Sequence, residues 1–279
     1  MNDKEPVVRY DGALDDFFGD AFRRGALVAF ASLPKSGKSF WLMDVVYRAV
    51  KQGRRVAWFY LEDRESVARN RYMRREQERP LEPVTYRYPV DLVVSSEGIG
   101  IDVEVRREND YSDADFDMLE AVDSGMLLLH HAGFGQLSVK SVQDRVQAAA
   151  VAGEPFDVIV VDCDNCLQNP KGVEGHDEQL NVLWLRLGKL AAENDCLVVT
   201  GTHVGGWNGV EDSLFQKKPY YAHASAVVGI DAGSTEDRYR GLQRLYYVTR
   251  RDGELGGGVA VAGCFAVSNP AVLAMPLAK

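Results

Sequence analysis

The sequence contains no long apolar segment, few cysteines and no excess of basic residues, and each absence excludes a class of protein. Its apolar runs, such as 26–31 and 158–161, are far shorter than the ~20 residues that a membrane-spanning helix needs. No basic segment followed by an apolar one opens the chain, so we expect a cytoplasmic protein without a secretory signal or a membrane partner. The 4 cysteines among 279 residues exclude a disulfide scaffold and are ordinary for a reduced chain.

The charge balance is acidic. There are 32 Lys and Arg residues against 41 Asp and Glu residues, which gives a net charge of −9. This excludes a globally basic coat for nucleic acid but leaves local basic patches open, because the field in a groove depends on where the charges lie. The hydrophobic fraction of 46% is typical of a globular chain with a sizeable core.

Apolar runs alternate with amphipathic segments, which predicts an α/β fold with a mostly parallel sheet flanked by helices. The strands are expected at 26–31, 55–61, 157–161 and 196–200. The helices are expected at 38–52, 63–79 and 178–194. The stretch 224–267 is typical of a β-rich C-terminal edge with a turn at Asp252-Gly253.

The segment 80–125 interrupts this alternation. It begins with three prolines, and its part from Asp102 to Asp123 holds nine acidic and two basic residues. We expect a surface insertion within a single domain that spans 1–279, with a solvated acidic helix, and a protein-contact role is the alternative. Residues 1–24 are expected to be a lead-in to the domain.

The segment Ser32-Leu33-Pro34-Lys35-Ser36-Gly37-Lys38-Ser39 is a near match to the phosphate-binding loop GxxxxGK[ST], with Ser32 in place of the first glycine. A strand precedes it and a helix follows, as the motif requires. Backbone N–H groups of such a loop surround phosphates, Lys38 neutralises the β- and γ-phosphates, and the Ser39 hydroxyl holds Mg²⁺. The sequence therefore predicts binding of ATP and Mg²⁺.

Acidic residues follow two of the predicted strands. Asp162 ends the strand 157–161, where a Walker B carboxylate binds Mg²⁺, and Asp164 is a nearby competitor. Glu62 follows the strand after the phosphate-binding helix, at the ligand edge of the sheet, where it can activate water as a general base. Asp63 and Glu65 compete with it for this role.

Three further positions carry interpretations of their own. His203 follows the strand at 196–202, where it can contact the γ-phosphate, and Thr202 can share the role. Arg251, with Arg250 as the alternate, lies near a predicted hairpin tip and can reach a neighbouring subunit as an arginine finger. No other arginine is recognisable as placed for this task. Cys163 and Cys166 form a lone CxxC pair, which we interpret as structural.

Two segments suggest contacts with other molecules. The stretch 204–221 is either an ordinary loop or a site for single-stranded nucleic acid, in which bases stack on aromatic rings beside phosphate-binding lysines. Its relevant residues are Trp207, Phe215, Lys217, Lys218, Tyr220 and Tyr221. The segment 64–79 holds six arginines and three acidic residues, so it is a solvated helix face or a subunit or nucleic-acid contact.

The order of these motifs resembles the RecA-like ATPase domain of the hexameric replicative helicases of the DnaB type, and of related stand-alone plasmid and phage replication ATPases. The resemblance covers roughly 14–267. It rests on Leu14-Asp15 and Phe22–Leu27 before the loop, Ser32–Ser39, Tyr60-Leu61-Glu62, Val160-Val161-Asp162, the helix 180–192, Thr202-His203 and Arg251-Asp252-Gly253. In the family a lysine usually precedes the closing arginine by two residues, whereas this chain has Thr249.

The resemblance implies an ATP hydrolase that forms a hexameric ring and moves along single-stranded DNA as a helicase, with Glu62, His203 and Arg251 as catalytic residues. The helical domain that precedes the ATPase domain in bacterial replicative helicases is not recognisable, which favours a plasmid or phage protein. Two other classes remain open. One is a RecA-type recombination factor that forms filaments, and the other is a regulatory ATPase that binds no nucleic acid.

Overall fold

The structure is a computed structural model that describes residues 5–95, 98–111, 116–204, 218–252 and 255–277. A nine-stranded sheet runs through it in the order β11-β10-β9-β8-β1-β7-β6-β2-β5. The strands are β1 (Leu27–Ser32), β2 (Val56–Tyr60), β5 (Leu127–His131), β6 (Val158–Asp162), β7 (Leu197–His203), β8 (Ala226–Asp231), β9 (Leu242–Arg250), β10 (Val259–Cys264) and β11 (Asn269–Pro276). The six strands from β8 to β5 are parallel, and β9, β10 and β11 add an antiparallel edge.

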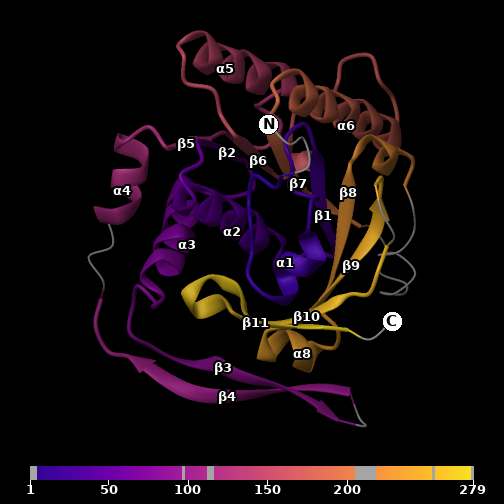
Figure 1. Ribbon diagram of the computed structural model, residues 1–279. Coiled ribbons are helices and arrows are strands. Elements are labelled where there is room, and N and C mark those ends of the chain that lie inside the picture. The colour runs from indigo at the N-terminus through magenta and orange to yellow at the C-terminus, as the bar shows by residue number, and fades with distance from the viewer. Residues whose placement is uncertain (1–4, 96–97, 112–115, 205–217, 253–254, 278–279) are drawn as a thin grey trace.

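Helices cover both faces of this sheet (Figure 1). On one face lie α1 (Ala13–Phe18), α2 (Lys38–Lys51) and α3 (Glu65–Gln77), and on the other lie α5 (Val139–Val151) and α6 (His176–Glu193). The strands β1 and β6 are buried along their whole length because both faces are covered, which explains why they are continuous apolar runs in the sequence. The expected strands and the expected helices at 38–52, 63–79 and 178–194 are confirmed, with bounds within three residues.

A buried ionic cluster joins α2 to α3. The carboxylate of Asp44 accepts hydrogen bonds from Arg48 at 2.9 Å and from Arg75 at 2.8 Å, and Asp44 is fully buried. Removing one member of a buried, hydrogen-bonded charge cluster leaves the others uncompensated, so such a cluster holds its elements in register. This fixes α3, which follows β2, against the helix that follows the phosphate-binding loop.

The segment 80–125 differs from the expectation of a solvated acidic helix. It forms an antiparallel hairpin, β3 (Val84–Ser95) and β4 (Gly98–Glu108), and then the short helix α4 (Phe116–Asp123). The acidic stretch is therefore divided between β4 and α4. The hairpin lies across the antiparallel edge of the main sheet (Figure 1), where Ile101 packs with Leu242 and Ala262. Alternating charged and apolar residues on β4 are consistent with a strand that is buried on one face only.

The C-terminal region also differs from a simple meander. The strand β8 pairs in parallel with β1, and the short helix α8 (Thr235–Arg240) separates it from β9. The remaining elements are the short 3-10 helices η1 (Asp164–Cys166), η2 (Pro219–His223) and η3 (Phe265–Val267). Among the residues that the structure describes, no helix combines the length and the apolar character that crossing a membrane demands.

Candidate nucleotide-binding site

The loop between β1 and α2 has a backbone that depends on glycine at its end. Gly37 has a φ of 89°, in the left-handed region that glycine adopts without strain. A Cβ atom at Gly37 would lie only 2.6 Å from Nε2 of Gln243, so this position also has no room for a side chain. Ser32, which replaces the first glycine of the motif, is buried, and its hydroxyl donates to the Leu33 carbonyl at 3.0 Å.

Lys38 begins α2 and extends along the carboxyl end of the sheet. The residue is 4% exposed. Its stem passes over Gly201 of β7, where an added Cβ would lie 3.0 Å from Cδ of Lys38. The ammonium group is close enough to Asp162 and His203, the last residues of β6 and β7, to interact electrostatically with both side chains. Lys38 also lines the cleft described below.

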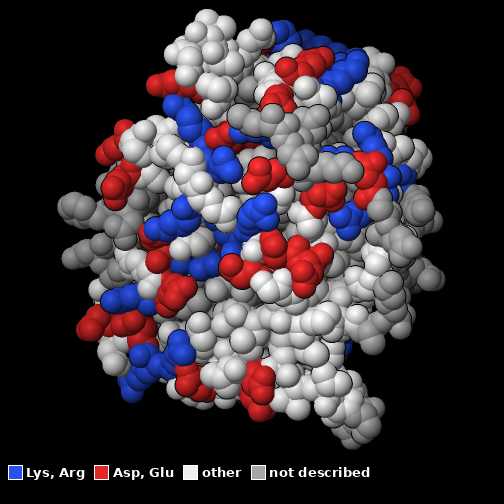
Figure 2. Space-filling model, in the orientation of Figure 1, with Lys and Arg blue, Asp and Glu red and all other residues white. Residues whose placement is uncertain are grey.

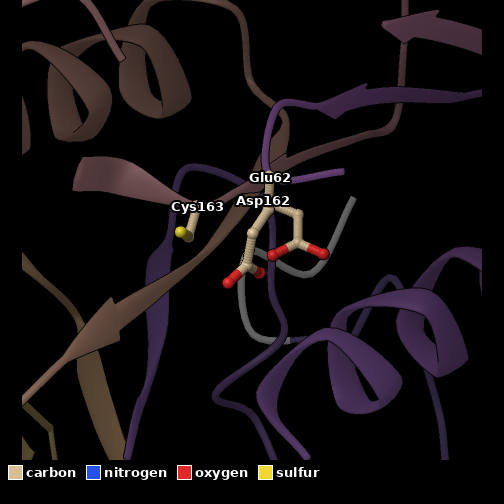
Figure 3. Close-up of side chains that lie close together, drawn as sticks. All are labelled: Glu62, Asp162 and Cys163. Atoms are coloured by element: carbon tan, nitrogen blue, oxygen red, sulfur yellow. The ribbon is translucent and has the colours of Figure 1, made fainter. Parts of the chain in front are cut away.

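Ser39 brings together the two carboxylates that were predicted from strand ends. Its hydroxyl lies 3.0 Å from Oε2 of Glu62 and 3.2 Å from Oδ1 of Asp162. Figure 3 shows the two carboxylates side by side, with the thiol of Cys163 turned to another side. Because a hydroxyl has a single proton to donate, it satisfies only one of the two carboxylates at a time. At any moment the Ser39 hydroxyl therefore leaves one of its two carboxylate neighbours without its proton.

Asp162 carries the clearest sign of a cation site. It is fully buried, and its Oδ2 has no hydrogen-bond partner among the described residues. Burial, and after it the negative charge of Glu62, raises the pKa of Asp162 from 3.8 to about 6. A buried carboxylate with an unpaired oxygen is destabilised unless a cation approaches it. The donor set of carboxylate and hydroxyl oxygens fits Mg²⁺, which prefers oxygen ligands.

Replacing Asp162 by Asn should raise the stability of the protein without metal or nucleotide. A carboxyl pKa that is higher in the folded state means that folding stability falls as pH rises from about 4 to 6 and stays low above that. A shift of about two pKa units corresponds to about 2–3 kcal/mol at neutral pH. The Asp162→Asn chain should therefore melt several degrees higher at pH 7.5, as measured by calorimetry with a chelator present.

The same measurement at pH 4 provides the control, because Asp162 is then protonated in the wild type and the two melting temperatures should converge. A variant that is less stable than the wild type at pH 7.5 would show that the carboxylate is already compensated within the chain.

The competitors of Asp162 and Glu62 have other partners. Asp164 is buried and accepts hydrogen bonds from the Trp184 indole at 2.7 Å and from the backbone N–H of Asn165 at 2.6 Å, so it is occupied away from Ser39. Asp63 lines the cleft, but its Oδ1 accepts from the backbone N–H of Arg64 at 2.8 Å. Glu65 forms an ion pair with Arg69 on the surface of α3.

His203 ends β7 and faces the cleft, while its neighbour Thr202 is buried. Nδ1 of His203 lies 3.4 Å from the side-chain amide of Asn165, which follows the strand of Asp162. Burial, and then the charge of Lys38, lowers the pKa of His203, so the ring is neutral at pH 7. A neutral imidazole can accept one hydrogen bond and donate another, which suits contact with a phosphate oxygen.

A cleft of about 430 Å³ joins these groups. Its wall also includes Arg71 of α3, an arginine that the sequence did not single out. Arg71 donates a 3.0 Å hydrogen bond to the Tyr60 hydroxyl, and its guanidinium lies over the ring of Phe40, 5.0 Å from its centroid. The sequence offered no other arginine for the finger role, and the structure adds Arg71 as an arginine in the wall of the cleft. The only signal for Arg71 was its place in an arginine-rich helix after Glu62.

The expectation of a solvated face for 64–79 is met only in part, because its arginines are divided between the surface and the interior. Arg75 is buried in the Asp44 cluster, and Arg71 is in the cleft. Arg69 and Arg74 pair with Glu65 and Glu82 on the protein surface. This helix uses its positive charges mainly within the chain.

Arg251 lies at the opposite edge of the sheet from the cleft. In the register of the sheet, Arg250 of β9 lies opposite Ala226, the first residue of β8, and Ala226 lies beside Val28 near the start of β1. The phosphate-binding loop follows the other end of β1, which runs for about 20 Å. The exposed side chain of Arg251 donates to the Ala222 carbonyl at 3.2 Å. Arg251 is thus turned away from the cleft of its own chain.

Arg250, the alternate to Arg251, is engaged within the chain. It forms a 2.7 Å ion pair with Asp20 and lies over the ring of Tyr247, 4.8 Å from its centroid. Of the two arginines, Arg251 is the exposed one.

The segment 204–221 supports nucleic-acid binding less than its composition indicates. Tyr220 and Tyr221 are buried against Trp184, with ring centroids 5.1 and 5.4 Å away, so neither ring can stack on a base. Lys218 lies 4.0 Å from Asp177. Trp207, Phe215 and Lys217 lie outside the described residues.

The CxxC pair is buried beside the site. The sulfur atoms of Cys163 and Cys166 are 3.4 Å apart, and Cys163 also contacts the side-chain oxygen of Asn165 at 2.7 Å. Cys163, Glu62 and Asp162 are the one group of possible metal ligands found among the described residues. The thiols fill the turn between the strand of Asp162 and helix α6, in line with a structural role.

Comparisons with known proteins agree with this architecture. No protein-family model matches the sequence, and no curated protein matches it. The solved structures that are similar in fold include the following two, each at 13% sequence identity. The first is the structure of an ATPase domain, with a TM-score of 0.65, and the match covers 88% of this chain and 84% of that domain. The second is a DnaB-like replicative helicase, solved for its interactions with primase, with a TM-score of 0.66, and the match covers 94% of this chain and 62% of the helicase. The chain therefore has the RecA-like α/β fold of the ATPase domains of DnaB-type helicases.

Proposed function

We propose that this protein is a Mg²⁺-dependent ATPase that hydrolyses ATP by in-line attack of water. The observation that carries the proposal is the Ser39 hydroxyl held between Glu62 and Asp162 beside a phosphate-binding loop. The orphaned oxygen of Asp162 supports a cation at this position. The loop, the buried lysine and the two carboxylates all border one cleft or lie at its base.

The residues divide the work as follows. The backbone N–H groups of the loop and the Lys38 ammonium bind the phosphates. Ser39 and Asp162 would hold Mg²⁺, which neutralises charge on the β- and γ-phosphates when bound. Glu62 accepts a proton from the attacking water, while the oxygen of that water bonds to the γ-phosphorus. The bond from that phosphorus to the bridging oxygen breaks and releases ADP. Arg71 and His203 are placed to contact the γ-phosphate from the cleft wall.

The proposal extends to a ring. Arg251 cannot reach its own cleft, since it lies at the amino ends of the parallel strands. A neighbouring copy that offers Arg251 to this cleft would complete the site, and closed rings arise from such head-to-tail contacts. We infer a ring-forming DNA translocase of the helicase class that acts in plasmid or phage replication. The fold shared with a DnaB-like helicase supports this class.

A second candidate is a regulatory ATPase that remodels a protein partner. On the face shown in Figure 2, basic and acidic side chains are interleaved rather than gathered by sign. The net charge of −9 and the burial of Tyr220 and Tyr221 favour this alternative. Such a protein shares the ATPase chemistry with the DNA translocase, but it acts on a protein partner instead of on DNA.

Single-stranded DNA distinguishes the two candidates. If the protein is a translocase, an oligonucleotide should raise the rate of phosphate release from ATP, and salt should weaken the stimulation, because phosphate contacts release counterions. The rates are measured with and without the oligonucleotide at low and moderate salt, with Lys38→Ala as the background control. Unchanged hydrolysis, together with no oligonucleotide binding at low salt, would favour the protein-remodelling ATPase.

A further inference from the structure

Gln243 of β9 lies directly beneath the phosphate-binding loop, although it is distant from the loop in sequence. The residue is 1% exposed and does not line the cleft. Its Nε2 donates a 2.7 Å hydrogen bond to the Ser36 carbonyl, and its Oε1 accepts a 2.9 Å hydrogen bond from the Trp41 indole. Both ends of one buried amide are therefore used, one on the loop and one on helix α2.

Trp41 sets the orientation of this amide. An indole N–H can only donate, so the oxygen of Gln243 must face Trp41. The amino group is then turned toward the loop, where a carbonyl is the partner that it requires. A flipped amide would place two donors against each other and two acceptors against each other, both buried, which is strongly unfavourable. Trp41 is itself fully buried in the core, so packing fixes the position of its indole N–H.

The hydrogen bond to Ser36 also fixes the next N–H group. A peptide unit is planar and trans, so the Ser36 carbonyl and the Gly37 N–H point in opposite directions. With the carbonyl held toward buried Gln243, the Gly37 N–H is turned toward the open side, where Gly37 lines the cleft. The left-handed backbone of Gly37 is part of the same arrangement.

We propose that Gln243 is a positioning residue for phosphate binding: it orients the Ser36–Gly37 peptide so that its N–H group is ready to donate to a phosphate oxygen. This role rests on the proposed function of the loop. It goes beyond that function because it makes Gln243, a residue of the antiparallel edge, responsible for the orientation of one peptide of the loop. The antiparallel strand β9 thereby supports the nucleotide site from below.

Two variants separate the hydrogen bond from the volume of the side chain. Gln243→Leu keeps nearly the same size and removes both hydrogen bonds. Gln243→Glu keeps an acceptor for Trp41 but, at pH 9, where its carboxyl group is ionised, turns a carboxylate oxygen toward the Ser36 carbonyl. In both variants the dissociation constant of ATP, measured by calorimetric titration, should rise about 10- to 100-fold, the value of a hydrogen bond to a charged group. Gln243→Glu provides the measurement if Gln243→Leu does not fold.

Tyr247→Phe is the matched control on the same strand. The Tyr247 hydroxyl donates to the Phe17 carbonyl at 3.0 Å and is buried, but it lies near the other end of β9. Removal of this hydroxyl should lower the melting temperature, because one buried hydrogen bond is lost. It should leave the ATP affinity within about 2-fold of the wild type.

The outcomes are distinct. Weaker ATP binding in both Gln243 variants, beyond that of Tyr247→Phe, supports the positioning role. Wild-type affinity in the Gln243 variants with a lowered melting temperature would show that Gln243 serves stability alone. If the wild-type chain itself binds no ATP, the proposed function is wrong, and the role of Gln243 fails with it.

Discussion

Chains with Arg251 replaced by Ala should hydrolyse ATP roughly 10³- to 10⁵-fold more slowly than the wild type, the value of an arginine finger in phosphoryl transfer. The cleft opens at the carboxyl edge of the sheet and contains Arg71 but not Arg251. In the proposed ring, Arg251 of a neighbouring chain neutralises the negative charge that develops on the outer side of the γ-phosphate. ATP binding itself should be little affected.

Mixing two inactive chains tests the direction of this contact. Arg251→Ala chains have an intact loop, and Lys38→Ala chains have an intact finger, so their mixture should recover part of the activity. The specific rate of the wild type should also rise with protein concentration. Full activity in a dilute monomer, or in Arg251→Ala alone, would contradict a role in trans.

Arg250→Ala is the matched control for this experiment. Because Arg250 is paired with Asp20 and lies over Tyr247, its loss should lower the melting temperature and leave most of the hydrolysis rate. Replacement of Arg251 should thus lower the rate of hydrolysis, whereas replacement of Arg250 should lower the stability of the protein.

The Glu62→Gln chain should bind ATP and hydrolyse it about 10²- to 10⁴-fold more slowly, the usual contribution of a general base. Glutamine keeps the shape of the side chain and can still accept the hydrogen bond from Ser39, but it cannot take a proton from water. Single-turnover hydrolysis and ATP titration on the same sample measure the two properties.

Asp63→Asn is the matched change next to Glu62. It should retain most of the rate, because the Asp63 carboxylate caps its own turn at the backbone N–H of Arg64, whereas Glu62 contacts Ser39. If Asp63→Asn strongly lowered the rate of hydrolysis and Glu62→Gln left it normal, the general base would be Asp63 and not Glu62.

The parts of the site that could be predicted from sequence depend on local patterns. The spacing of Gly37, Lys38 and Ser39 predicts a loop between a strand and a helix, and the structure places this loop between β1 and α2. Carboxylates at strand ends meet because parallel strands share one edge, so Glu62 and Asp162 converge on Ser39 although they are far apart in the sequence. The catalytic roles themselves stay predictions.

The parts that could not be predicted depend on long-range packing. Gln243 contacts Ser36 across 207 positions of sequence, and nothing in its own neighbourhood indicates that contact. Arg71 was one of six arginines in the segment 64–79, and its contacts with Tyr60 and Phe40, which lie outside this segment, show that it faces the cleft. Composition left two roles open for Tyr220 and Tyr221, because rings that pack on the core and rings that stack on bases are the same residue types, and the structure shows both rings buried.

The most direct test of the central claim is phosphate release from ATP by the wild type and by Lys38→Ala, each with Mg²⁺ and with a chelator. Lys38 is buried at the end of the sheet, and among the described residues the exposed Lys35 of the same loop is the one other lysine that lines the cleft. We predict hydrolysis by the wild type that requires Mg²⁺, and no hydrolysis above background by Lys38→Ala, with the fold intact by circular dichroism. Equal phosphate release by the two chains would contradict the assignment of this site.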